Sequence, residues 1–347
     1  MLFCTNWLII PQFGLGGEIS LIFRFIISWL IFFPLLVGAT ASEQPLRRIA
    51  IVSNENFNDL VHRIEASVFM EGASHPMLIH LDAYQLNPEE INQSDYELIV
   101  TVGEVALDKV LEHQITKPIL ATLLRKSQFY GLLSNYNIPL PQYNPPITAL
   151  FLDQPIHRQM NLIKCLLPDM PQKNAVGVIL GPGSSLYQNT LKKTAMDKRL
   201  SLNMVYVNPS ENPISAMNYV LKEAKVLLTI PDQSVYNVHT ARGILLSAFR
   251  SHVPVIGFSK AYVNIGALAA VYSNPHHMAL EISEEIMRIF NHPGRPLSSP
   301  KYPHMFQVAL NTQVCQAFSL PDYSESALQY ALQEMERTHA EVCHVSK

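Results

Sequence analysis

From Arg48 onward, short runs of β-branched and other apolar residues alternate with segments whose apolar residues recur every three or four positions. This pattern is typical of an α/β fold, because each parallel strand needs a crossover before the next one. The first set of expected strands is "RIAIVSN", "PMLIHLD", "YELIVTVG", "KPILATLL" and "PITALFLD". The segments "NFNDLVHRIEASVFMEG" and "EVALDKVLEHQ" predict helices, and "SNYNIPLPQYNPPI" predicts a loop because it is rich in proline and asparagine.

The pattern then starts again. The segments "NAVGVILGPGSS", "LNMVYVN", "KVLLTIPDQS" and "VPVIGFS" predict strands, and four helical patterns, "PIHRQMNLIKCLLPD", "SLYQNTLKKTAMDKR", "NPISAMNYVLKEA" and "VYNVHTARGILLSAFRSH", alternate with them. Two such sets are more than one sheet comfortably holds. The sequence therefore predicts an α/β fold with two doubly wound parallel-sheet lobes joined by a hinge.

The segment "PVIGFSKAYVNIGALAAVYSNP", residues 254–275, begins as a strand, breaks, and soon enters another strand. We interpret the break as a hinge crossing that lines a ligand cleft. Ser259 to Gly266 is the part expected to move, because Gly257 and Gly266 can absorb backbone rotation.

The N-terminus has a different character. The uncharged run "FIISWLIFFPLLV" follows Arg24 and precedes Ala39-Thr40-Ala41, which fits a small-residue cleavage pattern. This predicts a secretory signal peptide over residues 1–41, cleaved after Ala41, and hence a periplasmic protein. An uncleaved anchor is the alternative, since apolar character reaches back to Ile19. Translation from an alternative start at Leu21 would give a signal of ordinary length.

Composition narrows the function classes. The 347 residues are 48% hydrophobic and 15% charged, with a net charge of −3, which gives no reason to expect nucleic acid as a partner. After signal cleavage the cysteines would be Cys165, Cys315 and Cys343, an odd and widely spaced set that argues against a disulfide framework.

Several longer segments carry a family resemblance. "LLTIPDQSVYN", "TARGILLSAFR", "VPVIGFSKAYVNIGALAAVYSNP" and "FQVALNTQV" resemble ABC transporter substrate-binding proteins, in the group that includes tryptophan- and tyrosine-binding proteins. The resemblance implies the type I periplasmic-binding fold, a monomer that delivers a small-molecule ligand to an ABC permease in the inner membrane. It also implies that Gly266 to Tyr272 returns the chain to the first lobe.

The expected domains follow from that resemblance. The N-terminal lobe takes residues 46–150 plus about 267–300, and the C-terminal lobe takes 151–266 plus about 301–325. Residues 326–347 are expected to form a C-terminal tail. One position departs from the family: Glu104 stands where many relatives have a Gly-Thr or Gly-Ser turn, which puts in doubt the transfer of an amino-acid carboxylate site.

Ligands of open α/β sheets bind beyond the carboxyl ends of the strands, so the residues that follow each strand are candidates. Those strand ends also include Arg125. From them we expect ligand contacts at Asn54, Gly103, Glu104, Ser184, Asp232, Gln233, Tyr236, Ser259 and Tyr262. Asp232 is the favoured partner for a ligand ammonium, although an Asp before a helix is equally explained as an N-cap, and Ser234 is better explained as one. Tyr262 is a candidate aromatic contact, whereas Phe258 is better explained as core.

Other chemistry is poorly supported. "GPGSS" lacks the Gly-Lys-Ser/Thr ending of a phosphate loop, so a nucleotide site is disfavoured and no cofactor is expected. His276-His277 and "HAEVCH" do not form a convincing metal site. No Gly-x-Ser-x-Gly elbow or catalytic pair emerges, and we expect no enzymatic activity.

The favoured function is therefore the solute-binding component of an ABC-type importer, which captures an amino acid or similar small metabolite in the inter-lobe cleft by hinge closure. The alternative is an envelope sensory or scaffolding module of the same fold that binds a partner protein. An exposed apolar patch, or a cleft filled by the protein's own side chains, would favour the alternative.

Overall fold

The structure is a computed structural model that describes residues 47–70, 75–139, 144, 146–168 and 176–345, without the side chains of 338–345. The segment predicted to be a signal peptide lies outside the described residues, as does the side chain of Cys343. Among the described residues, no helix has both the length and the apolar character needed to cross a membrane.

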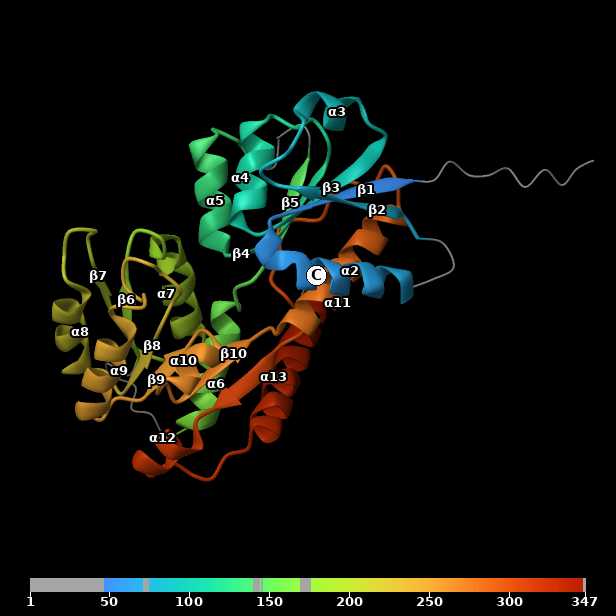
Figure 1. Ribbon diagram of the computed structural model, residues 1–347. Coiled ribbons are helices and arrows are strands. Elements are labelled where there is room, and N and C mark those ends of the chain that lie inside the picture. Colours follow the sequence, from blue (N-terminus) through green and yellow to red (C-terminus); the bar gives the residue numbers. More distant parts are fainter. Residues whose placement is uncertain (1–46, 71–74, 140–143, 145, 169–175, 346–347) are drawn as a thin grey trace, which may run out of the picture. The chain divides into compact units, whose positions relative to one another are not determined.

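The first lobe is built on a five-stranded parallel sheet in the order β2-β1-β3-β4-β5 (Figure 1). Its strands are β1 (Arg48–Ser53), β2 (Met77–Asp82), β3 (Tyr96–Val102), β4 (Ile119–Leu124) and β5 (Ile147–Phe151). Alternate residues of β1 enter different cores, with Ile49 and Ile51 on one face and Ala50 and Val52 on the other. Both faces are therefore covered, as buried parallel strands require.

Helices fill the two faces of this sheet. The helices are η2 (Glu55–Phe57), α2 (Asn58–Met70), α3 (Pro88–Gln93), α4 (Glu104–Glu112), α5 (Lys126–Asn135) and α11 (Pro275–Phe290). Helices α2 and α11 lie side by side on one face, while α4 and α5 contribute to the core on the other. Neither α3 nor α5 is expected from the sequence pattern.

The second lobe is built on a six-stranded sheet in the order β11-β10-β9-β8-β6-β7. Its strands are β6 (Val176–Leu180), β7 (Leu202–Tyr206), β8 (Val226–Leu228), β9 (Val255–Gly257), β10 (Ala269–Tyr272) and β11 (Gln307–Leu310). Every neighbouring pair is parallel except β10 and β11. The fold class is thus the predicted one, with two doubly wound sheets.

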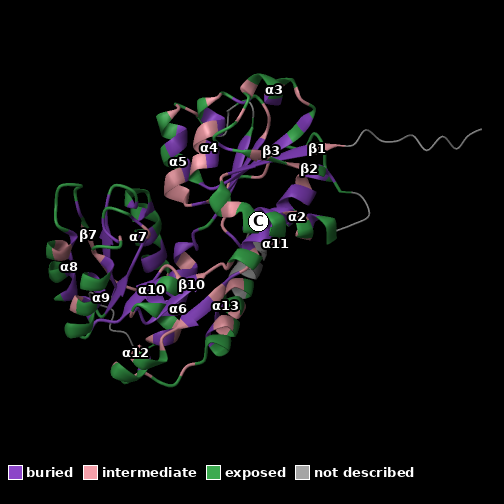
Figure 2. Ribbon diagram, viewed as in Figure 1, coloured by how far each residue is buried: buried purple, intermediate pink, exposed green. Residues whose placement is uncertain are grey.

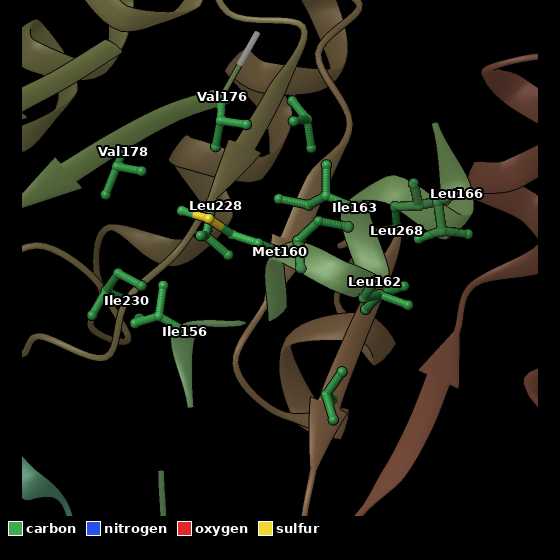
Figure 3. Packing of buried hydrophobic residues seen from close by; sticks show 14 of the residues in the cluster. Ile156, Met160, Leu162, Ile163, Leu166, Val176, Val178, Leu228, Ile230 and Leu268 are labelled. Carbon is green, nitrogen blue, oxygen red and sulfur yellow. The ribbon is translucent and has the colours of Figure 1, made fainter. Parts of the chain in front are cut away.

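The helices of the second lobe also lie on two faces. They are α6 (Ile156–Leu166), η3 (Ser185–Tyr187), α7 (Gln188–Asp197), α8 (Pro213–Leu221), α9 (Ala241–Arg250), α10 (Lys260–Asn264), α12 (Thr312–Ala317) and α13 (Glu325–Val345). Figure 2 shows strands that are mostly buried and helices whose outer faces are exposed. Figure 3 shows Met160 and Ile163 of α6 gathered with Leu228 of β8 in the core that α6 shares with the sheet.

The structure corrects the expected lobe boundaries in two places. Strand β10 pairs with β9 and β11, so 269–272 belongs to the second sheet and the chain returns to the first lobe only afterwards, through α11. Residues 259–266 accordingly join two strands of one sheet and do not cross between lobes. The pattern after "HMFQVAL" also predicts a terminal helix, and this helix, α13, is not a free tail, because it buries Leu328 and Leu332 in the second-lobe core.

Candidate functional site

A cavity of about 530 Å³ lies where the carboxyl ends of the two sheets and the segments that join them come together. Parallel strands direct their carboxyl ends and the following helix N-termini to one edge, which is where open α/β sheets bind ligands. The lining residues are Phe57, Glu104, Val105, Leu123, Arg125, Gln128, Leu152, Asp153, Gln154, Ile156, Gln159, Tyr187, Ile230, Pro231, Phe258, Ser259, Val271, Tyr272 and Ser273.

The first-lobe wall carries an arginine. Arg125 lies between the end of β4 and the start of α5, and its backbone N–H donates to Gln128 Oε1 at 2.8 Å. The Gln128 amide in turn donates to the Glu104 carboxylate at the start of α4. Among the described residues, no carboxylate lies within ion-pair distance of the half-buried Arg125 guanidinium. The cavity wall therefore presents a guanidinium that makes no ion pair with any described carboxylate.

Leu123 reaches the same wall through a strained backbone. Its φ is +56°, a left-handed value that branched residues rarely adopt, and the register of β4 against β5 shifts between Thr122 and Leu124. Such strain costs about 1–3 kcal/mol and is typical of functional sites. Here the shift directs the Leu123 side chain into the cavity lining and brings Arg125 to the strand end.

Asp153 forms a buried acidic group where the chain leaves β5. Its Oδ2 accepts from the backbone N–H of Lys126 at 2.7 Å and from the Tyr187 hydroxyl at 2.5 Å. Burial raises the pKa of Asp153, although these hydrogen bonds and the charge of Arg125 act in the opposite direction. Burial and the nearby Asp153 also raise the pKa of Tyr187. Asp153 thus joins the first lobe, through Lys126, to Tyr187 of the second.

The second-lobe wall is mainly apolar. Ile230 and Pro231 follow β8, and Phe258 follows β9, while Val271 comes from β10. Ser259 lies beside them as the N-cap of α10, and its hydroxyl accepts from the backbone N–H of Tyr262 at 3.2 Å. This wall suits a flat or branched apolar group.

A second cavity of about 290 Å³ adjoins the first, with Glu104, Arg125, Gln128 and Pro231 in both linings. Asp232, Gln233, Gly183 and residues of α5 complete it. The two cavities therefore share the charged wall.

Of the residues predicted from the sequence, Glu104 and Ser259 line the larger cavity, and Glu104, Asp232 and Gln233 line the smaller one. Asn54 caps η2 through a hydrogen bond from the Asn56 N–H at 3.2 Å. Gly103 precedes α4 with a φ of +91° and supports the Phe57 ring. Neither Asn54 nor Gly103 belongs to either lining.

Asp232 is occupied by contacts within the protein. Its carboxylate accepts from the backbone N–H and hydroxyl of Ser184, each at 2.8 Å, and from the N–H and hydroxyl of Ser234 at 2.9 and 2.6 Å. A side chain on Gly181 would lie 2.2 Å from Ser234 Oγ and 2.8 Å from Asp232 Oδ2, so glycine is required there. These contacts give Asp232 and Ser184 a structural role that joins two loops.

The aromatic residues lie in places opposite to those expected: Tyr236 and Tyr262, expected to contact the ligand, are core residues, and Phe258, expected in the core, lines the cavity. Tyr236 and Tyr262 are buried at 6% and 5% exposure and pack against each other with ring centroids 6.3 Å apart. Phe258 covers them and itself lines the cavity. For Tyr236, the sequence pattern predicts one continuous helix over 235–252, whereas residues 233–240 form turns and bends and α9 begins only at Ala241.

Several lining residues were not predicted. Asp153, Tyr187 and Ser273 follow strands β5, β6 and β10, and the strand-end rule could have found Asp153 and Ser273. Gln154 precedes α6 and Gln159 lies in its first turn, whereas Gln128 comes from α5, which the sequence pattern does not predict. Within the part of the chain that the structure describes, no cluster of three or more His, Cys, Asp or Glu residues is arranged to hold a metal ion.

Comparison with known families decides the identity. Residues 82–333, most of the chain, match the family described as ABC transporter substrate binding protein. The chain belongs to this family. The family consists of substrate-binding proteins and not of enzymes. No curated protein sequence matches the chain.

Solved structures resemble this substrate-binding protein in fold. A conserved domain protein from Vibrio cholerae is 15% identical, with a TM-score of 0.55, and the match covers 82% of this chain and 98% of that one. An ABC domain from Streptococcus pneumonia in complex with L-Trp is 14% identical, with a TM-score of 0.53 and coverage of 82% and 97%. The ligand-free, open structure of a substrate binding protein with adhesive properties from Clostridium difficile is 13% identical, with a TM-score of 0.59 and coverage of 80% and 96%. The substrate-binding protein thus has the type I periplasmic binding protein fold.

Proposed function

We propose that this substrate-binding protein is the periplasmic component of an ABC-type importer and captures a small zwitterionic ligand, such as an amino acid with an apolar side chain. The observation that carries the proposal is the guanidinium of Arg125, which lines the cavity without an ion pair to any described carboxylate. An arginine of this kind suits a ligand carboxylate, because its paired N–H groups match the two carboxylate oxygens.

Two features support the rest of the ligand. Glu104 and Asp153 provide acidic groups in the same lining for a ligand ammonium. Glu104, which departs from the family at this position, would then serve as an ammonium partner. Phe258, Ile230 and Pro231 provide an apolar surface for a side chain. Binding would consist of closure of the two lobes around the ligand, since residues from both lobes line the cavity.

Membership of the family supports the proposed location and partner. Delivery to an ABC permease in the inner membrane requires export, for which we propose the signal peptide over residues 1–41. The closed form would be the one recognised by the permease, and a ligand shifts the equilibrium only as far as it binds that form more tightly. We also propose that the mature protein acts as a monomer.

The alternative, a module that binds a partner protein, called for a cleft filled by its own side chains or for an exposed apolar patch. The open cavity of about 530 Å³ favours a solute. The proposal is tested by thermal unfolding of residues 42–347, freed of bound ligand by unfolding and refolding, against single amino acids and small metabolites. A ligand at a hundred times its dissociation constant adds about 2.7 kcal/mol to the unfolding free energy, enough to raise the midpoint measurably. Absence of any shift from folded, ligand-free protein would favour the partner-binding module.

A further inference from the structure

The chain passes between the two sheets at three places, residues 152–155 after β5, 273–274 after β10, and 302–305 before β11. The third passage starts at the edge of the first sheet, where Lys301 bridges to Leu150. These three crossing segments are the parts of the backbone that must accommodate any relative motion of the lobes.

The crossing segments are joined by side chains that also line the cavity. The amide of Gln154, in the first crossing, donates to the Ser273 hydroxyl of the second crossing at 2.9 Å. That hydroxyl donates to the Met305 carbonyl of the third crossing at 2.6 Å. One continuous chain of hydrogen bonds thus runs across all three.

Arg158, on the first turn of α6, stabilises this series of hydrogen bonds. Its guanidinium donates to Gln154 Oε1 at 2.7 Å and to the Pro303 carbonyl at 2.9 Å, so a single side chain fixes the first and third crossings. The guanidinium also lies over the Phe306 ring at 4.1 Å from its centroid. The Arg158 side chain is 5% exposed, so its charge needs a partner nearby.

That partner comes from the C-terminal helix. Glu336 of α13 accepts from Arg158 Nε at 2.5 Å and from Nη2 at 2.8 Å, in a two-pronged pair. Glu336 lies beyond residue 333, where the match to the family ends. The third crossing is also fixed by the first lobe. The Glu281 carboxylate of α11 accepts from the backbone N–H groups of His304 and Met305 at 3.0 and 2.6 Å.

We infer that α13 is a hinge clasp: Glu336 is a positioning residue that orients Arg158, and Arg158 fixes the first and third crossing segments directly and the second through Gln154. Two-pronged pairing leaves Arg158 Nη1 free to donate to Gln154 and Pro303, whereas an unpaired guanidinium would turn toward solvent. The inference rests on the proposed function only in treating the crossings as a hinge for ligand capture.

The test is backbone hydrogen exchange, followed by mass spectrometry, of the ligand-free mature chain and its Glu336→Gln variant. Exchange should accelerate roughly tenfold in peptides that cover all three crossings. These include 273–274, because Ser273 is linked to Gln154 and Met305 and not directly to Glu336. The matched control is Glu334→Gln, which removes the same charge from the same helix where Glu334 pairs with exposed Arg337, and it should leave the crossings unchanged.

A second variant separates positioning from the docking of α13. In Arg158→Met/Glu336→Leu an apolar pair replaces the ion pair. Such a replacement of a buried ion pair is often neutral or stabilising for the fold. The variant has no side-chain donor left for Gln154 and Pro303. We expect a melting temperature near that of the parent together with fast exchange in the crossings. Acceleration confined to α6 and α13 in Glu336→Gln, or crossings protected as in the parent in the double variant, would overturn the clasp. Because no ligand is used, this failure would be distinct from failure of the proposed function.

Discussion

The ring of Phe57 lies so close to Gly103 that a Cβ atom at residue 103 would be 2.5 Å from Phe57 Cε2. Gly103 also has a φ of +91°, a conformation that residues with a side chain rarely adopt. The glycine that follows β3 therefore does two things: it turns the chain into α4, and it leaves room for an aromatic residue of the cavity lining.

We expect Gly103→Ala to lower the unfolding free energy by about 1–2 kcal/mol, from the cost of the left-handed backbone alone, and to displace Phe57. Denaturant unfolding and ligand titration would measure the two effects. Gly131→Ala is the matched control, because its added Cβ meets nothing within 4 Å inside helix α5. That control should be neutral or stabilise by up to about 1 kcal/mol. Equal stability of the two variants would contradict the strain at Gly103.

Arg125→Gln should abolish or greatly weaken ligand binding while leaving the fold intact. The change removes the charge that we assign to the ligand carboxylate, and loss of one partner of such a pair costs about 2–5 kcal/mol. Calorimetric titration with whichever amino acid stabilises the parent protein would measure the loss. The control is Arg242→Gln on the exposed side of α9. Unchanged affinity in Arg125→Gln would remove the observation on which the proposed ligand class depends.

Asp232→Asn distinguishes a structural carboxylate from a ligand contact. Asparagine has nearly the same size, but its amide nitrogen cannot accept the hydrogen bonds that Ser184 and Ser234 donate. We expect the unfolding free energy to fall by about 2 kcal/mol, with ligand affinity changed little. The opposite outcome, full stability with loss of binding, would restore Asp232 as the ammonium partner that the sequence pattern favoured.

Stability should fall steeply in acid. Burial by itself would raise the pKa of Glu285. The hydrogen bonds and charges of Arg288 and Lys301 outweigh burial and lower that pKa to about 2, from an ordinary 4.5. Burial would likewise raise the pKa of Glu336, but His157 and Arg158 lower it to about 2. A carboxylate whose pKa is lower in the folded state stabilises the fold above its unfolded pKa, and this contribution is lost as pH falls through the folded pKa.

The loss should therefore occur between about pH 4.5 and pH 2, and amount to up to about 3 kcal/mol for each carboxylate. Urea unfolding at a series of pH values would measure it. The Glu285→Gln variant should be less stable than the parent at neutral pH and should lose less over the acid range. A variant with the same acid dependence as the parent would show that Glu285 does not contribute in this way.

Much of the local structure was predictable. Periods of two and of three to four residues are set by neighbours along the chain, so the strands and most helices were found. Glu104 and Ser259, which the strand-end rule selects, line the cavity. Helix α5 was missed because its sequence, "KSQFYGLLSN", has weak helical periodicity and a central glycine.

What the sequence could not decide depends on partners that are remote along the chain. The residues 269–272 form a good strand in either lobe, and only their pairing with β9 and β11 assigns them to the second sheet. Asp232 reads equally well as a ligand contact or a cap until Ser184, 48 residues earlier, occupies its carboxylate. The last helix was interpreted as a tail because nothing local shows that Glu336 meets Arg158 across 178 residues. By itself, the sequence determined most of the elements and the edge at which a ligand is expected, since both follow from local periodicity and strand polarity. Only the tertiary structure decided which charges remain free for a ligand, because a charge is free or paired according to what the rest of the chain places beside it.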